Sequence, residues 1–292
     1  MKVHMYGMGL LAALVSTLLI AGIAAAQDTA GSTEAAPEGE GANDTMIQMG
    51  PPPGYDGHHV CWLEFAFKEQ AATVKFYEDL FGWKFIPYEK MENYVFYQTA
   101  SGVMGGFNGQ GFGEMQNTIF YIYVPDVDAA LAEVEAAGGK TLVPKMPVEE
   151  SGSIALFTDP AGVTVGLADM YMYEPSPNPM DGAKPAVNTI CYLEIFGGDF
   201  AKTSEFYSKV FGWTTTPSPH HEEYLGFASG GGADGVFQSH TPDIPVVAYI
   251  WVDDVAATLA KIKEAGGEPY GEATPTPMGV FGYFKDPSGI WM

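Results

Sequence analysis

Two carboxylates lie inside strongly apolar stretches of the sequence, Glu64 within residues 61–65 and Glu194 within residues 191–195. Burying a carboxylate among aromatic side chains is costly unless the group is paired or protonated. Burial is therefore expected to raise the pKa of both side chains, which suits a general base or a hydrogen-bond donor. The alternative is that each glutamate accepts hydrogen bonds from a tyrosine or the backbone and only fixes its strand.

The histidines and glycines offer weaker chemistry. The six histidines fall in the N-terminal apolar segment or in polar stretches, at His4, His58, His59, His220, His221 and His240. This scatter predicts surface histidines, and the alternative is a metal site built around His58. The glycines at 230–232 lie between predicted strands rather than at the start of a helix, so they form no phosphate loop. No nucleophile elbow is present.

Composition excludes some partners. The chain has 292 residues and a formal net charge of −23, which would repel a phosphate backbone, so no nucleic-acid partner is expected. Hydrophobic residues make up 47 % of the chain, enough for a sizeable core. The two cysteines, Cys61 and Cys191, are no disulfide framework and are expected as small buried hydrophobes. The alternative is a Cys61–Cys191 disulfide in an oxidising compartment.

The N-terminal segment carries an export signal. Lys2 precedes an apolar run at 8–26 that ends in small residues, which is typical of a secretory signal peptide over 1–26. The alternative is a membrane anchor, because the run is just long enough to span a bilayer. Residues 27–57 are small, acidic and poor in large apolar side chains, which predicts a disordered linker. A periplasmic or secreted protein follows, with the signal segment as its only membrane contact.

The rest of the chain repeats itself. Residues 61–65 match residues 191–195, Phe76-Tyr77 matches Phe206-Tyr207, and residues 81–83 match residues 211–213. A fixed offset over many positions indicates two copies of one unit. We therefore expect one domain at 58–172 and a second at 187–292, joined by a Pro-rich linker at 173–186. The domains are expected to pair within the chain or as a homodimer.

Periodicity predicts the same elements in each copy. In the first, a strand at 60–67 precedes a helix at 71–81 that Gly82 stops, and short strands follow near 83–88, 94–99 and 102–107. The order then starts again with a strand at 118–124 and a helix that Asp126 or Asp128 caps and that runs through Ala137. Strands near 140–146, 153–158 and 163–168 complete the copy. Each copy is thus two βαβββ modules, an α+β fold.

These motifs resemble a known family. The strings FYEDLFGW at 76–83 and FYSKVFGW at 206–213, with the FTDPAG and FKDPSG turns, resemble the glyoxalase, bleomycin-resistance and extradiol-dioxygenase (vicinal oxygen chelate) superfamily. The resemblance covers about 58–170 and 187–292. It implies tandem glyoxalase-like domains, in each of which two βαβββ modules form a curved eight-stranded sheet around a cup for a small molecule.

The resemblance also implies where a metal would bind. Family enzymes hold a divalent ion with side chains of the first, fifth and last strands. Those positions correspond to Trp62, Ile119 and Gly166 in copy one and to Tyr192 and Val247 in copy two, the last falling after residue 292. None of these side chains ligates a metal in the usual way. We therefore expect no metal and no other cofactor.

Strand alternation then fills each cup with aromatic rings around one carboxylate. Glu64 and Glu194 are the candidate catalytic residues. The candidate ligand-binding residues are Trp62, Tyr121 and Tyr123 in copy one and Tyr192, Tyr249 and Trp251 in copy two. Such a lining suits a small apolar or aromatic ligand. The alternative is that the rings simply fill the cups.

The sequence thus predicts an exported glyoxalase-like protein that lacks the usual metal ligands and binds a small apolar or aromatic molecule. One alternative is a metal-dependent lyase or dioxygenase of the same superfamily, using ligands not identified above. Another is a non-catalytic structural or interaction protein. Whether the chain is an enzyme stays open; if it is, a lyase or an oxidoreductase is expected.

Overall fold

The computed structural model describes residues 57–88, 92–109, 111, 116–148, 152–170, 184–239, 244–277 and 279–292. The predicted signal peptide, residues 27–56 of the acidic linker and residues 173–183 of the Pro-rich linker lie outside these ranges. Within them, no helix is long and apolar enough to cross a membrane.

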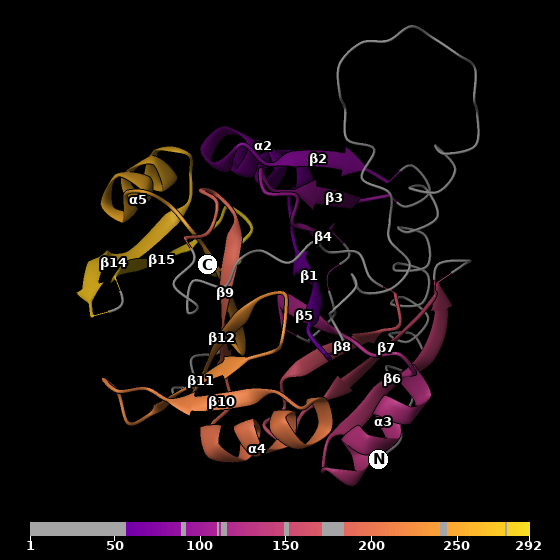
Figure 1. The fold of residues 1–292 in the computed structure, drawn as a ribbon. Helices are drawn as coiled ribbons and strands as arrows, with labels where there is room; N and C mark the ends of the chain where they lie inside the picture. Colours follow the sequence, from indigo (N-terminus) through magenta and orange to yellow (C-terminus); the bar gives the residue numbers. More distant parts are fainter. Residues whose placement is uncertain are drawn as a thin grey trace, which may run out of the picture.

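Copy one folds as two βαβββ modules joined edge to edge (Figure 1). Its sheet has eight strands in the order β2-β3-β4-β1-β5-β8-β7-β6, and the antiparallel pairing of β1 with β5 joins the modules. The predicted α+β fold is confirmed. The elements are β1 (Val60–Ala66), α2 (Gln70–Phe81), β2 (Lys84–Pro87), β3 (Tyr94–Gln98), β4 (Met104–Asn108), β5 (Thr118–Tyr123), α3 (Val127–Ala136), β6 (Lys140–Val148), β7 (Gly152–Thr158) and β8 (Thr164–Ala168).

Copy two repeats this order of elements, but its strands form two separate hydrogen-bonded sheets. The described residues form a five-stranded sheet, β10-β11-β12-β9-β13, and a separate β14-β15 pair. The predicted single eight-stranded sheet is therefore not formed here, because the residues after β15 make one bridge, Lys285–Trp291, and no ladder with β13. The elements are β9 (Ile190–Phe196), α4 (Phe200–Phe211), β10 (Thr214–Pro217), β11 (Tyr224–Ala228), β12 (Asp234–Gln238), β13 (Val246–Ile250), α5 (Val255–Glu264), β14 (Glu268–Thr276) and β15 (Gly279–Lys285).

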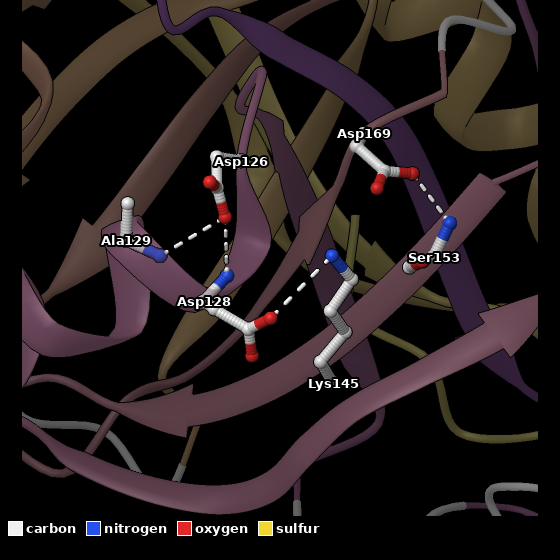
Figure 2. Close-up of polar contacts among 6 residues, drawn as sticks. All are labelled: Asp126, Asp128, Ala129, Lys145, Ser153 and Asp169. Atoms are coloured by element: carbon white, nitrogen blue, oxygen red, sulfur yellow. Dashed lines mark hydrogen bonds and ion pairs between the residues drawn. The ribbon is translucent and has the colours of Figure 1, made fainter.

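Local sequence sets the helix ends. Gly82 takes the left-handed conformation that closes α2, with φ of 67°, and Gly212 closes α4 in the same way, with φ of 70°. Asp126 caps α3 by accepting hydrogen bonds from the backbone of Asp128 and Ala129 (Figure 2). In the same view Lys145 of β6 pairs with Asp128, which ties the first turn of α3 to the sheet.

The two faces of the first sheet differ in what they contact. Leu63, Phe65 and Phe67 pack in the core that includes the helix residues, whereas Trp62 and Ala66 belong to a second cluster without helix residues. A register shift between Val60 and Trp62 interrupts the alternation, and Cys61 joins Trp62 in the second cluster. Cys61 and Cys191 are both free and buried, so the disulfide alternative is not seen.

The repeated motifs hold the two copies together. Phe284, from the second copy's FKDPSG turn, packs against Phe76 and Phe81 of α2, at ring-centroid distances of 6.1 and 6.4 Å. Phe157 from the first copy's turn packs in the same way against Phe206 and Phe211 of α4, at 6.0 Å each. Figure 1 accordingly shows α2 beside α5 at one end and α3 near α4 at the other. Each copy thus docks its first helix on the other copy's turn.

Hydrogen bonds reinforce this reciprocal contact. Tyr77 donates to Asp286 Oδ2 and Tyr207 donates to Asp159 Oδ2, both at 3.2 Å. Burial raises the pKa of each aspartate to about 6, although backbone N–H groups that donate to the carboxylate act in the opposite direction. The indole of Trp83 donates to the backbone carbonyl of Asn188 at 2.7 Å.

Replacing Asp159 with Asn should flatten the pH dependence of stability. Burial raises the pKa of Asp159 in the folded state to about 6, from an ordinary value of 3.8, so Asp159 favours the folded state below pH 4 and loses that contribution as pH rises through 6. A shift of this size corresponds to about 1–3 kcal/mol, which D159N should remove. Urea unfolding at pH 4, 5, 6 and 7 measures it. Glu205→Gln, at an exposed site of α4, is the control, and an unchanged slope in D159N would contradict the assignment.

Candidate functional site

Glu64 lies at the centre of the face of the first sheet that is turned away from the helices, here called the first cup. Its side chain is 0 % exposed. Tyr121 donates to Oε2 at 3.1 Å, and the Asn108 amide donates to Oε1 at 3.3 Å. Burial raises the pKa of Glu64 to about 7, against the opposing effect of these two donors. The carboxyl group can therefore gain or lose a proton near neutral pH.

Glycines make room for the tyrosines around Glu64. A Cβ at Gly166 of β8 would lie 2.0 Å from the Tyr121 ring, and a Cβ at Gly106 of β4 would lie 2.1 Å from the Tyr94 hydroxyl. The Tyr121 ring therefore covers position 166 on the neighbouring strand, to which it is paired in register. The sequence analysis had placed the family's last metal ligand at this position.

The first cup is closed by apolar side chains. Trp62, Tyr94 and Tyr121 are all buried, and Phe96 packs edge-on against Trp62 at a centroid distance of 6.0 Å. The cluster is completed by aliphatic residues from β5 to β8 and the segment after β8, namely Ile119, Val143, Met146, Val148, Ile154, Leu156, Ala168 and Met170. Glu64 and its donors thus lie within an apolar interior, away from solvent.

The corresponding face of copy two, the second cup, keeps contact with solvent. Glu194 is 7 % exposed and accepts a hydrogen bond from Tyr283 at 2.8 Å. Burial raises its pKa, while hydrogen bonds from Tyr249 and Tyr283 act in the opposite direction. Tyr192, Tyr249 and Tyr283 are only half-buried. The carboxylate thus lies beneath tyrosine rings that solvent can reach.

Most of the predicted ligand-binding residues lie beside the carboxylates. Trp62 and Tyr121 join the first cup, and Tyr192 packs edge-on against Tyr249 in the second at 5.8 Å. Tyr123 lies at the edge of the first cup, half-buried and stacked on His59 at 5.7 Å. Trp251 follows β13 and is half-buried. The catalytic and binding roles assigned to these residues stay predictions.

The positions that the resemblance implies for a metal hold side chains that do not usually ligate one. In the first cup the three positions that the resemblance implies hold an indole, an isoleucine and a glycine, and the Tyr121 ring covers the glycine. Across the described residues, no three His, Cys, Asp or Glu side chains come close enough to hold an ion. Near the cup centres the described residues offer the carboxylates of Glu64, Glu194 and Asp234, the Asn108 amide and tyrosine hydroxyls, which is a poor donor set for a tightly held cation.

The histidines lie in environments other than a metal site. His59 is buried against Tyr123, and burial lowers its pKa to about 4. His58 packs edge-on against Phe211 at 6.0 Å, and its backbone carbonyl accepts a hydrogen bond from Trp213 at 2.5 Å. His220 and His221 lie in the turn before β11, and His240 is outside the described residues. His58 and His59 are therefore interface and interior residues rather than the surface histidines predicted.

Sequence reasoning found Tyr121 and Tyr249 but missed other neighbours of both glutamates. Asn108 and Tyr94 surround Glu64, and Gln238 and Tyr224 occupy the matching positions of copy two. The signal was available, because each pair is separated by the same 130 residues as the two glutamates. Tyr283 could not be found in this way, since its counterpart in copy one is Leu156.

The family assignment follows from a match over both copies. The family described as "Glyoxalase/Bleomycin resistance protein/Dioxygenase superfamily" matches residues 58–167 and 189–292. This chain belongs to that superfamily. The match covers most of both predicted domains, and the resemblance stated from the motifs is confirmed.

Individual relatives have diverged in sequence. CFP32 of Mycobacterium tuberculosis (strain CDC 1551 / Oshkosh), a candidate glyoxylase by its name, is 28 % identical over 252 residues, which is 78 % of this chain and 90 % of that protein. The anthracycline biosynthesis protein DauV of Streptomyces sp. (strain C5) is 23 % identical and covers 78 % of this chain and 89 % of its own length. Both therefore resemble this chain across the two copies.

Solved structures share the fold. The Mn(II)-bound glyoxalase from Novosphingobium aromaticivorans aligns with a TM-score of 0.58 at 16 % identity, covering 80 % of each chain. The 2,3-dioxygenase LapB from Pseudomonas sp. KL28 aligns with a TM-score of 0.57 at 13 % identity, covering 82 % of this chain and 92 % of its own. At such identities the likeness concerns the fold alone.

A Gly166→Ala substitution should disturb the first cup. The added Cβ would overlap the Tyr121 ring, so the ring must move and its hydrogen bond to Glu64 must lengthen or break. We expect a loss of about 1–3 kcal/mol in the free energy of unfolding. Gly57→Ala is the matched control, because its Cβ would meet one backbone atom at 3.7 Å. Equal stabilities of G166A and G57A in urea unfolding would show that Tyr121 does not need this space.

Proposed function

We propose that this chain is an exported, metal-independent member of the superfamily that binds a small aromatic or apolar molecule on an aromatic cup. The observation that carries the proposal is the Tyr121 ring lying over Gly166, where the resemblance places a metal ligand. Aromatic rings around one or two polar groups are what a small-molecule site needs. Export rests on the N-terminal sequence.

The second cup is the better candidate for the binding face. Its tyrosines are half-buried, so a ligand can replace water on the rings without displacing a packed interior. In the first cup the corresponding rings are buried, and both oxygens of Glu64 have donors. These contacts favour a structural role for Glu64, which was the alternative drawn from its sequence context.

Glu194 is the residue through which binding could become catalysis. A general base needs a raised pKa and access to a bound molecule. Burial raises the pKa of Glu194, and the tyrosines above it are open to solvent. A lyase or an isomerising reaction that begins with proton abstraction is the chemistry this carboxylate could support. The role is a proposal and awaits a substrate.

Metal analysis tests the first part of the proposal. The purified protein should contain less than about 0.1 divalent ion per chain, because neither cup offers three ligands. Treatment with a chelator should leave the melting temperature and ligand binding unchanged. A stoichiometric ion whose removal abolishes an activity would instead favour the metal-dependent lyase or dioxygenase.

Ligand binding tests the second part. A neutral aromatic probe, indole, at about 100 times its Kd should raise the free energy of unfolding by about 2.7 kcal/mol. Tyr192→Ala should weaken indole binding, because it removes one half-buried wall of the second cup. Ile86→Ala, at an exposed position on β2, is the control. If indole and phenol both leave thermal and urea unfolding unchanged, the chain is better explained as a structural or interaction protein.

A further inference from the structure

Glu194 lies among tyrosines. Tyr283 donates to its carboxylate at 2.8 Å, and the Tyr249 ring contacts both the Tyr283 and the Tyr192 rings. Burial, followed by the negative charge of Glu194, raises the pKa of Tyr192, Tyr224, Tyr249 and Tyr283. Among the described residues, the ion pairs of lysines involve Lys75, Lys145, Lys184 and Lys202, and none reaches Glu194. A largely buried carboxylate with tyrosines and no lysine among these contacts lacks the positive counter-charge that would stabilise its ionised form.

The register places a second carboxylate on the same face. Val236 of β12 pairs with Glu194, and Asp234 pairs with Tyr192, so Asp234 and Glu194 share the side of the sheet that forms the second cup. Asp234 is buried, and its Oδ1 accepts hydrogen bonds from the backbone and the hydroxyl of Ser229. Two carboxyl groups therefore share this face of the sheet.

The rings themselves are arranged edge to face. Tyr192 and Tyr249 meet at a centroid distance of 5.8 Å and an interplanar angle of 85°. Tyr249 and Tyr283 meet at 5.8 Å and 64°. Rings set at such angles form adjoining walls rather than a flat stack, and the negative faces of aromatic rings attract cations.

A nearby pair already shows this chemistry. Lys285 of β15 lies with its ammonium 4.8 Å from the centroid of the Trp291 ring. Lys285 is therefore engaged by an aromatic face.

Copy one lacks these features at the matching positions. Leu156 stands where copy two has Tyr283, Met104 where it has Asp234, and Trp62 where it has Tyr192. The first cup is thereby apolar and closed, whereas the second gains a carboxylate and two phenol groups. The two copies have thus diverged in charge at their centres while keeping the same fold.

We propose that the second cup binds a small organic cation, a quaternary or alkylated ammonium group, with Glu194 as its counter-ion and Tyr192, Tyr224, Tyr249 and Tyr283 as its aromatic walls. This inference rests on the proposed ligand-binding function and names its substrate class. The cation supplies the positive counter-charge that Glu194 lacks, and the rings replace the water that such a weakly hydrated cation gives up.

Two probes of equal shape separate charge from size. Choline and 3,3-dimethylbutan-1-ol differ by the exchange of a quaternary nitrogen for carbon. The full chain should be titrated with each while its tyrosine and tryptophan fluorescence is followed. Choline should bind at least tenfold more tightly, as expected for several cation–π contacts and one desolvated counter-ion. Equal binding of the two probes, or tighter binding of the alcohol, overturns the inference.

Substitutions test whether the preference for choline arises at the second cup. Glu194→Gln should reduce the preference for choline to below about threefold, because the shape is kept and the charge is lost. Glu205→Gln, an equal change of charge at an exposed position of α4, should leave the preference unchanged. Tyr192→Leu should weaken choline binding by about three- to fivefold, which gives an independent measurement if E194Q does not fold. An unchanged preference in E194Q, or an unchanged choline affinity in Y192L, would overturn the assignment to this cup.

Failure of this inference and failure of the proposed function can be told apart. If indole binds and choline shows no advantage over its isostere, the site takes neutral molecules and the cation assignment is wrong. If neither indole nor choline binds, the proposed ligand-binding function is wrong as well.

Discussion

The structure depends on a reciprocal aromatic contact between the two copies. The Phe-Tyr and Phe-Gly-Trp motifs of one copy supply the rings, and the Phe-x-Asp-Pro turn of the other supplies the partner. Tyr77 and Tyr207 add hydrogen bonds to the aspartates of those turns. The same residues therefore form two equivalent contacts, and one hydrophobic core includes residues of both copies. The motifs that make the repeat visible in the sequence are thus mainly interface residues rather than site residues.

Because that contact uses the helix side of each sheet, the opposite face is free to carry chemistry. In both copies the first strand places a glutamate at the middle of this face, with a tyrosine of the fifth strand beside it. Their surroundings differ: Glu64 is enclosed by apolar side chains, and Glu194 lies under half-buried tyrosines. The same fold thus encloses a packed interior in copy one and leaves an accessible face in copy two.

Much of the fold could be predicted from the sequence because its signals are local. The glycines at 82 and 212, the cap at Asp126 and the alternation on β1 each act within a few residues, and the duplication confirmed them twice. The register shift near Cys61 places this residue in the same cluster as Trp62, which strand alternation alone does not indicate. The hydrogen-bond partners of the glutamates depend on contacts between distant strands. The side-chain contact between β15 and β9, in which Tyr283 donates to Glu194, has no signature in either strand alone.

The reciprocal contact also affects how the two cups can change during evolution. In a symmetric pair of separate chains, any substitution alters both halves at once, so the two cups must stay identical. Joining the halves in one polypeptide removes that constraint, while the linker keeps their local concentration high. Selection can then preserve the shared interface while matching positions of the two cups change independently. Met104 and Asp234 are one such pair of positions, and Leu156 and Tyr283 are another.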